Sequence, residues 1–196
     1  MKNFVQIGTN DGDDDFKQRC EQLVERSRII LIEPHIELKS TIESNWAHLL
    51  QKHDVTIVNK AIVPNKEIKS VDFYYQENNL VLSSVLDRRT YDLPQKKTVE
   101  SIHIDLLLEE MGIYEIEELH IDTEGLDYEI LLSINLDRTN IKNITCEIWP
   151  FEDDDKKESY KTGPQMRKNV RLKFTDYSIS EITLDKMPTL KFEKNV

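Results

Sequence analysis

Hydrophobic residues along the chain follow two different periodicities. Short runs rich in Val and Ile occur at residues 3–7, 28–33, 55–63, 118–122 and 143–149. The stretches after several of these runs instead repeat their apolar side chains every three to four positions, as one face of a helix does. Strands that alternate with helices are typical of a parallel sheet covered on both faces. The pattern therefore predicts an α/β fold.

The predicted helices follow three of these strands, and each carries one apolar stripe. Their stripe residues are Phe16, Cys20, Leu23 and Val24; Leu38, Ile42, Trp46, Leu49 and Leu50; and Leu126, Ile130, Leu131 and Ile134. The spacing within each group gathers the side chains on one side of a helix. We therefore expect each stripe to pack against the sheet.

The middle and the end of the chain are less regular. Residues 71–75, VDFYY, predict an added strand, residues 76–97 a polar loop, and residues 98–104, TVESIHI, a further strand. Near the end, residues 176–182 and 189–193 predict a closing antiparallel pair. The stretch between the main sheet and that pair contains Pro, Gly and an acidic block, which indicates an exposed connection.

Length and charge narrow the class of protein. The chain has 196 residues, 38% of them hydrophobic, and a net charge of −11. These values predict one acidic globular domain over residues 1–196. Because an acidic surface repels phosphate groups, the charge argues against nucleic acid and membranes as partners. A basic segment at residues 161–174 is typical of a solvated helix face, with an anionic acceptor as the alternative.

Short features of the sequence indicate where the protein is located and whether its cysteines are reduced. The longest apolar run has about four residues, whereas a bilayer span needs about 20. The amino terminus lacks the apolar core of a secretory signal, so we expect a cytoplasmic protein. Cys20 and Cys146 are too few for a disulfide framework or a zinc site, and we expect both to be reduced and buried.

The loop after the first strand carries the first sign of a ligand. Gly8 and Gly12 lie in QIGTNDGDDDF, where bare backbone lets a ligand approach a strand end. Glu33 ends the second strand 21 residues after Gly12, near the offset of about 20 residues expected for a ribose-binding acid. The glycines alone also fit an ordinary turn. Together with Glu33 they favour a ligand that contains adenosine.

The acids of this loop bear on which adenosine ligand it is. Asp11 and the run from Asp13 to Asp15 would repel the pyrophosphate of a dinucleotide. S-adenosylmethionine instead carries a sulfonium and an ammonium against one carboxylate, so it tolerates an acidic loop. The same acids would also stabilise a helix amino terminus, and the two interpretations are compatible.

The chain resembles the FkbM-type S-adenosylmethionine-dependent methyltransferases. The motifs that carry the resemblance are VQIGTNDG, IILIEPHIELKSTIESN, NKAI, VESIHIDLLLEEMG and LHIDTEGLDYEIL followed by ITCEIW. They run from about Phe4 to Trp149 in the order of the family, and the IDTEG block is the most specific. The resemblance implies a Rossmann-like class I methyltransferase fold, an α/β architecture. Its sheet would be mostly parallel and seven-stranded, with helices on both faces and a C-terminal antiparallel strand.

The family also implies an activity and a set of site residues. The implied activity is O-methylation of a hydroxyl on a sugar or other small metabolite, with S-adenosylmethionine as cofactor. The cofactor-binding residues would be Gly8, Thr9, Asn10, Gly12, Glu33, Asn59, Ala61 and Asp122. Within this set the first loop would surround the methionine part, Glu33 the ribose, and the backbone around Asn59 and Ala61 the adenine edge. Thr9 stands where the family usually has Ala.

Asp122 and Glu124 are the candidate catalytic residues. Asp122 would face the methyl-transfer centre, and carboxylates at i and i+2 of an extended segment point to the same side. Together they could orient the acceptor, take its proton or hold a divalent cation, although a metal is not predicted. The alternative is that one binds the ammonium of the cofactor and the other caps the next helix. His120 is expected to be structural and His35 to face solvent at the rim of the site.

Two further functions stay open at this point. The family usually has chain before the first strand that helps to cover the cofactor, and this sequence begins almost at that strand. A non-catalytic module that binds a cofactor or a partner is therefore the second hypothesis. A nucleotide-linked oxidoreductase is disfavoured by the acidic loop and by the missing third glycine.

Overall fold

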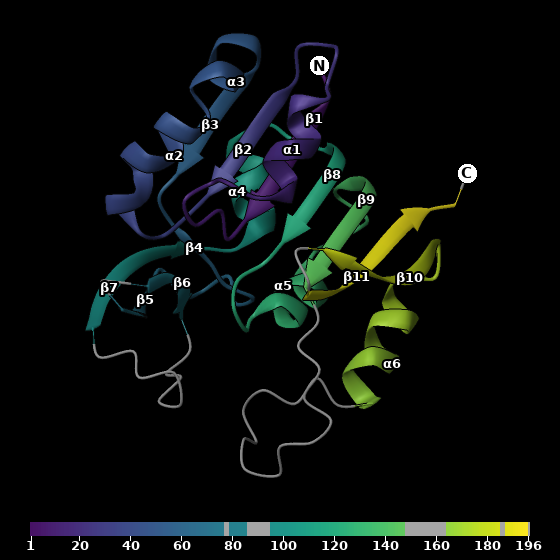
Figure 1. Cartoon of the computed structure of the whole chain (residues 1–196). Helices are drawn as coiled ribbons and strands as arrows, with labels where there is room; N and C mark the ends of the chain where they lie inside the picture. The colour runs from purple at the N-terminus through teal and green to yellow at the C-terminus, as the bar shows by residue number, and fades with distance from the viewer. Residues whose placement is uncertain (77–78, 86–94, 148–163, 185–186, 196) are drawn as a thin grey trace.

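A seven-stranded sheet forms the centre of the molecule (Figure 1). The computed structural model describes residues 1–76, 79–85, 95–147, 164–184 and 187–195. In spatial order the strands are β10 (Tyr177–Leu184), β11 (Met187–Lys194), β9 (Asn140–Glu147), β8 (Glu115–Ile121), β1 (Asn3–Ile7), β2 (Arg28–Ile32) and β3 (Asp54–Val58). The strands β9, β8, β1, β2 and β3 are mutually parallel, and β11 is antiparallel to both of its neighbours. The predicted sheet and its closing antiparallel pair are confirmed.

Helices cover both faces of this sheet. One face carries α1 (Asp15–Glu21), the short 3-10 helix η1 (Ile36–Leu38), α2 (Lys39–Asn45) and α3 (Ala47–Lys52), and the other carries α4 (Ile104–Glu110), α5 (Asp127–Ser133) and α6 (Pro164–Lys173). Alternate residues of β2 serve the two cores, because Ile29 and Leu31 pack under the first group while Ile30 and Ile32 pack under the second. A strand buried on both faces needs such a continuous apolar run.

The predicted apolar stripes are buried or partly buried, and two of their residues, Val24 and Leu50, are exposed. Val24 is 92% exposed, because α1 ends at Glu21 and the chain turns away before it can continue the stripe. Leu50 is 38% exposed, whereas Trp46 and Leu49 beside it are fully buried. The spacing therefore found the buried face of each helix but placed the end of the first helix one turn too late.

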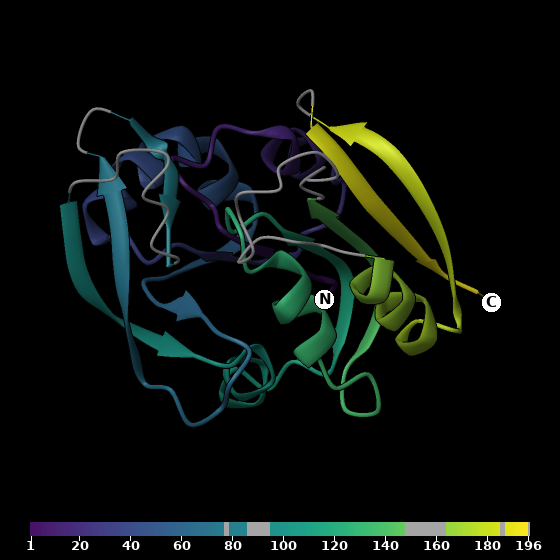
Figure 2. The same ribbon diagram turned by 90° about the horizontal axis from the view of Figure 1, so that it is seen from below.

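A second, four-stranded sheet lies beside the first (Figures 1 and 2). Its spatial order is β4 (Ala61–Ile62), β7 (Gln95–Ile102), β5 (Ser70–Gln76) and β6 (Asn79–Ser84). The strands predicted at residues 71–75 and 98–104 are thereby confirmed in type. The polar loop predicted for residues 76–97 is wrong in part, since β6 pairs with β5 within it and β7 begins at Gln95. The rest of that loop, residues 77–78 and 86–94, lies outside the described residues, as does most of the connection after β9.

Two expectations about single features also have an outcome. No helix in the described part of the chain is long and apolar enough to cross a membrane. Cys20 and Cys146 are both buried free thiols, as expected. Their burial raises the pKa of each thiol well above its ordinary value, so neither is poised as a nucleophile.

Candidate active site

A pocket opens where the carboxyl ends of the central strands meet the second sheet. It contains about 650 Å³ of open space, counted out to its mouth and including solvent there. Its lining residues are Ile7, Gly8 and Asn10 after β1; Ile32, Glu33 and Pro34 after β2; Lys60, Ala61, Ile62, Phe73, Ser83 and Val85 on the side of the second sheet; and Asp122, Thr123 and Glu124 after β8. Ligands of parallel α/β sheets bind at this edge, where the strand order reverses.

Gly8 brings the first loop against the end of β8. A Cβ atom at Gly8 would lie 1.6 Å from the carbonyl oxygen of Asp122, so only glycine fits. Its φ of +85° also belongs to the region that L side chains rarely adopt. The amide of Gly8 donates to the carbonyl of Ile32 at 3.0 Å, and the amide of Asp122 donates to that of Ile7 at 2.9 Å. Backbone from three strands is therefore packed at the floor of the pocket.

Glu33 is held at the pocket wall by backbone amides. One carboxylate oxygen accepts from the amide of Asn10 at 2.9 Å and the other from the amide of His35 at 2.8 Å. The side chain of Asn59 donates to the Glu33 carbonyl at 3.2 Å. Burial raises the pKa of Glu33 to about 7, against the lowering effect of the two amides and of Lys97. Each carboxylate oxygen keeps a further lone pair that can accept a ligand hydroxyl.

Other predicted cofactor residues lie near the pocket without lining it. The carbonyl of Gly12 accepts from the indole nitrogen of Trp46 at 2.7 Å, and a Cβ at Gly12 would lie 2.7 Å from that nitrogen. Thr9 is buried and Asn59 acts on the backbone of Glu33. Ala61, Gly8, Asn10, Glu33 and Asp122 are the predicted cofactor residues that do line the pocket. Through its contact with Trp46, Gly12 packs the first loop against the junction of α2 and α3.

The acids of the first loop have local partners outside the pocket. Asp14 caps α1 by accepting from the amide of Lys17 at 3.0 Å, while Asp13 and Asp15 form ion pairs with Lys17 and Arg19. None of these acids is among the lining residues. Helix capping is therefore their observed role, and the charge of the pocket comes from other carboxylates.

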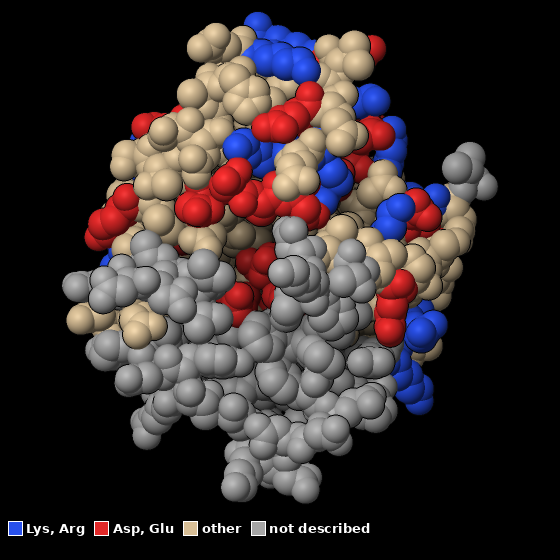
Figure 3. All heavy atoms as spheres, in the orientation of Figure 1, with Lys and Arg blue, Asp and Glu red and all other residues tan. Residues whose placement is uncertain are grey.

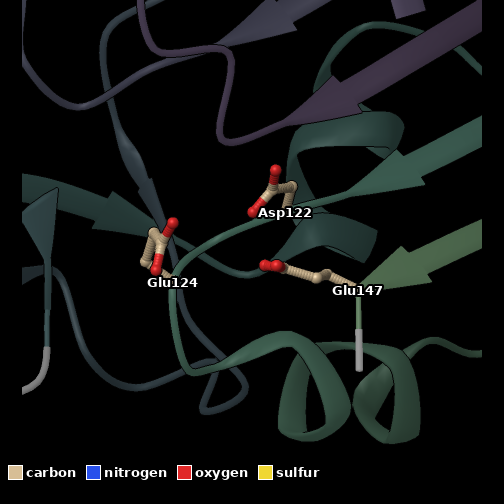
Figure 4. A group of neighbouring side chains, drawn as sticks. All are labelled: Asp122, Glu124 and Glu147. Atoms are coloured by element: carbon tan, nitrogen blue, oxygen red, sulfur yellow. The ribbon is translucent and has the colours of Figure 1, made fainter. Parts of the chain in front are cut away.

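Three carboxylates converge beside the carboxyl ends of β8 and β9 (Figure 4). Asp122 follows β8, Glu124 lies in the next loop and Glu147 ends β9, with ligand oxygens within 4.8 Å of one another. Burial and the neighbouring Asp122, Glu124 and Asp127 raise the pKa of Glu147 far above its usual range, so Glu147 holds a proton at neutral pH. Figure 3 shows Asp and Glu atoms recessed in a hollow on this side of the molecule. Such a group also has the oxygen ligands that divalent cations prefer.

The loop between β8 and α5 carries Glu124 in a strained conformation. Its backbone φ is +57°, and Asn10 across the pocket has a φ of +51°; they are the two non-glycine residues with positive φ in the described chain. Asp127 closes the loop by accepting from the amides of Thr123 at 2.7 Å and Gly125 at 2.9 Å. Strain of this kind concentrates at functional sites. The helix α5 begins at Asp127 without a side-chain cap, so Glu124 does not cap it.

The two histidines near the site are both buried. His120 lies in β8, where its Nδ1 pairs with the Thr145 hydroxyl at 2.7 Å and its ring stacks on Phe16. Burial lowers the pKa of His120 to about 3, and the structural role expected for it is confirmed. The solvent-facing position expected for His35 is wrong: it is 4% exposed, with its ring edge against Phe73 and Tyr75 of β5.

Sequence reasoning missed Glu147 and Phe73. Glu147 sits in the run ITCEIW, whose composition predicts only a strand. An acid within an otherwise apolar run next to a strand end was the available signal, because burying a carboxylate is costly. Phe73 carries no such signal, since its place in the pocket depends on the pairing of β5 with strands later in the sequence.

Comparison with known structures places this fold among methyltransferases. The chain matches fibrillarin from Aeropyrum pernix, solved with natively bound S-adenosyl-L-methionine, with a TM-score of 0.51 and 8% identity over 97% of this chain and 66% of that one. A putative rRNA methylase from Clostridium thermocellum matches with a TM-score of 0.51 and 10% identity over 100% of this chain and 87% of that one. A human methyltransferase 10 domain-containing protein matches with a TM-score of 0.50 and 11% identity over 100% of this chain and 72% of that one. At these identities the likeness shows the shared fold.

The sequence comparison is more specific. The model of the methyltransferase FkbM domain matches residues 6–179, which is most of the chain. No curated protein matches it. The match confirms the resemblance drawn from the motifs, and with the fold it supports S-adenosylmethionine as the cofactor. The chain belongs to the FkbM family of methyltransferases.

Proposed function

We propose that this protein transfers a methyl group from S-adenosylmethionine to a hydroxyl of a sugar or another small metabolite. The observation that carries the proposal is one pocket lined by Glu33, Asp122 and Glu124, with the carboxylate of Glu147 beside those of Asp122 and Glu124. When bound, the cofactor supplies an electrophilic methyl group on a positively charged sulfur.

The cofactor assignment follows the chemistry of the lining residues. Glu33, fixed by two amides, accepts the ribose hydroxyls with its remaining lone pairs. Ile32, Pro34 and Ile62 offer apolar surface beside it for an adenine ring. Asp122 supplies negative charge where the sulfonium and the ammonium would lie. A pyrophosphate would be repelled by the same carboxylate.

The carboxylates also supply what a hydroxyl acceptor needs. Methyl transfer forms a bond from the acceptor oxygen to the methyl carbon and breaks the bond from that carbon to sulfur, which keeps the electron pair. The hydroxyl proton must leave the acceptor at or after this step. Asp122 lines the pocket beside Glu124 and Glu147, so its carboxylate is placed to accept that proton while Glu124 orients the acceptor.

Two measurements test the proposal. Purified protein is incubated with S-adenosylmethionine carrying a labelled methyl group and a panel of sugars, polyols and polyketide-like alcohols. The proposal predicts that at least one hydroxyl compound gains the labelled methyl group as a methyl ether, identified by mass spectrometry. Tight binding of S-adenosylhomocysteine without transfer to any hydroxyl, amine or thiol would instead support the second hypothesis, a non-catalytic binding module.

A further inference from the structure

Ser84 connects the second sheet to the loop that carries Glu124. It is the last residue of β6 and is fully buried. Its hydroxyl donates to the backbone carbonyl of Glu124 at 2.9 Å, across 40 positions of sequence. A buried serine hydroxyl that donates to a backbone carbonyl distant in sequence fixes the position of that peptide group.

The residue whose carbonyl accepts from Ser84 has a strained backbone conformation. Glu124 has a φ of +57°, which an L side chain avoids unless surrounding contacts impose it. Asp127 holds the same loop through the amides of Thr123 and Gly125. The loop is therefore held through its amides from the side of α5 and through its carbonyl from the second sheet.

The second sheet is itself anchored at the far side of the pocket. β6 pairs with β5, β5 with β7, and β7 with β4, whose two residues line the pocket near Glu33. Ser83 and Val85, on either side of Ser84, also line the pocket. A continuous hydrogen-bonded sheet thus runs from the Glu33 side to the Glu124 loop, and Ser84 is its contact with that loop.

We propose that Ser84 is a positioning residue that holds the backbone of Glu124 so that its carboxylate stands beside those of Asp122 and Glu147. For its effect on turnover, the inference rests on the proposed function of these carboxylates. Ser84 acts through the loop and has no role in binding the adenosine part. Its loss should therefore reduce turnover and leave the affinity for the cofactor product unchanged.

Two variants of Ser84 and two matched controls test this role. Ser84→Ala removes the hydroxyl, and Ser84→Cys removes the strong donor while nearly keeping the volume. The controls are Ser101→Ala and Ser101→Cys, since Ser101 is also buried in the second sheet and donates to a backbone carbonyl, that of Ile68 at 3.2 Å, away from the Glu124 loop. Hydrogen exchange of the amides at residues 123–126 is followed by mass spectrometry, together with turnover and S-adenosylhomocysteine affinity.

We expect both Ser84 variants to speed amide exchange at residues 123–126 by about tenfold, and both Ser101 variants to leave it unchanged. Turnover should fall roughly 10- to 100-fold in the Ser84 variants, with unchanged S-adenosylhomocysteine affinity. Unchanged exchange in the loop, or equal losses in the Ser84 and Ser101 variants, would overturn the positioning role. If the wild-type protein transfers no methyl group, the proposed function fails, and the exchange measurement alone still decides whether Ser84 holds the loop.

Discussion

Two acidic sites in this chain are built in opposite ways. Asp105 of α4 is 2% exposed, and its carboxylate meets the ammonium of Lys66 at 2.9 Å and the amide of Asn135 at 3.0 Å. The carboxylates of Asp122, Glu124 and Glu147 instead face one another at the pocket. A buried carboxylate with a positively charged partner stabilises the folded protein. Carboxylates that face one another instead repel, and a bound ligand, a proton or an acceptor can reduce that repulsion. The contrast separates a structural ion pair from a site.

The largest effect is expected on turnover at the pocket. Asp122→Asn keeps the shape of the side chain but removes its charge and basicity, and we expect methyl transfer to fall by roughly 100- to 10,000-fold. The free energy of unfolding should stay the same or rise, because a repulsive charge is lost. Steady-state transfer and chemical denaturation measure the two quantities. Retained turnover in Asp122→Asn would remove this residue from the chemistry.

The second effect is a pH dependence of stability caused by Glu147. The pKa of Glu147 is raised to about 10 in the folded protein from an ordinary value of 4.5, so the folded state binds the proton more tightly. Its contribution is therefore full below pH 4.5 and is lost as the pH rises toward 10. In Glu147→Gln the side chain does not titrate, so its contribution to stability does not fall as the pH rises.

We expect the stability of Glu147→Gln relative to wild type to increase by about 3 kcal/mol between pH 5 and pH 8. Urea unfolding of both proteins across that range gives the difference. The exposed residue Glu193, changed to Gln, is the control and should show no such trend. A difference that is flat with pH would mean that Glu147 is ionised in the folded protein.

The structural ion pair should respond in the opposite sense. Asp105→Ala removes the partner of Lys66 and of the Asn135 amide, and we expect the free energy of unfolding to fall by about 2 kcal/mol. The loss stays below that of a fully buried pair because Lys66 is 43% exposed and regains water. Turnover at saturating substrate should be retained. A large loss of turnover in a folded Asp105→Ala protein would blur the distinction between the two groups of acids.

The smallest effect concerns ligand affinity and Glu33. Because its pKa is raised to about 7, Glu33 is ionised above neutral pH and increasingly protonated below it. A protonated carboxyl accepts fewer hydrogen bonds, so S-adenosylhomocysteine should bind about tenfold more weakly at pH 5.5 than at pH 8. Calorimetry at both pH values measures this change. In Glu33→Gln the affinity should be low at both, and an equal pH dependence in that variant would assign the titration to another group.

Much of the fold follows from local patterns in the sequence. The apolar run at residues 28–33 and its neighbours predict the parallel strands, because a strand buried on two faces is mostly apolar along its length. The strand β6 was missed, since NLVLSS gains its partner only by pairing with β5. The burial of His35 was missed for the same reason: the strand that covers it lies almost 40 residues later.

The site was predictable where a strand end fixed the position of a residue. Gly8, Glu33 and Asp122 lie directly after β1, β2 and β8, and parallel strands bring these ends together. Gly12 was placed in the same loop, but its position depends on packing against Trp46, which the loop sequence does not contain. The convergence of Glu147 on Asp122 needs the pairing of β9 with β8, which spacing alone does not supply.

Isothermal titration of the purified protein with S-adenosylhomocysteine and with NAD at pH 8 tests most directly whether an adenosyl donor binds in this pocket with its ribose on Glu33. We predict saturable one-to-one binding of S-adenosylhomocysteine, no heat from NAD, and loss of binding in Glu33→Ala. The matched variant Glu37→Ala, which removes an exposed acid nearby, should bind as wild type does. Binding of NAD in place of S-adenosylhomocysteine, or full affinity in Glu33→Ala, would contradict the account.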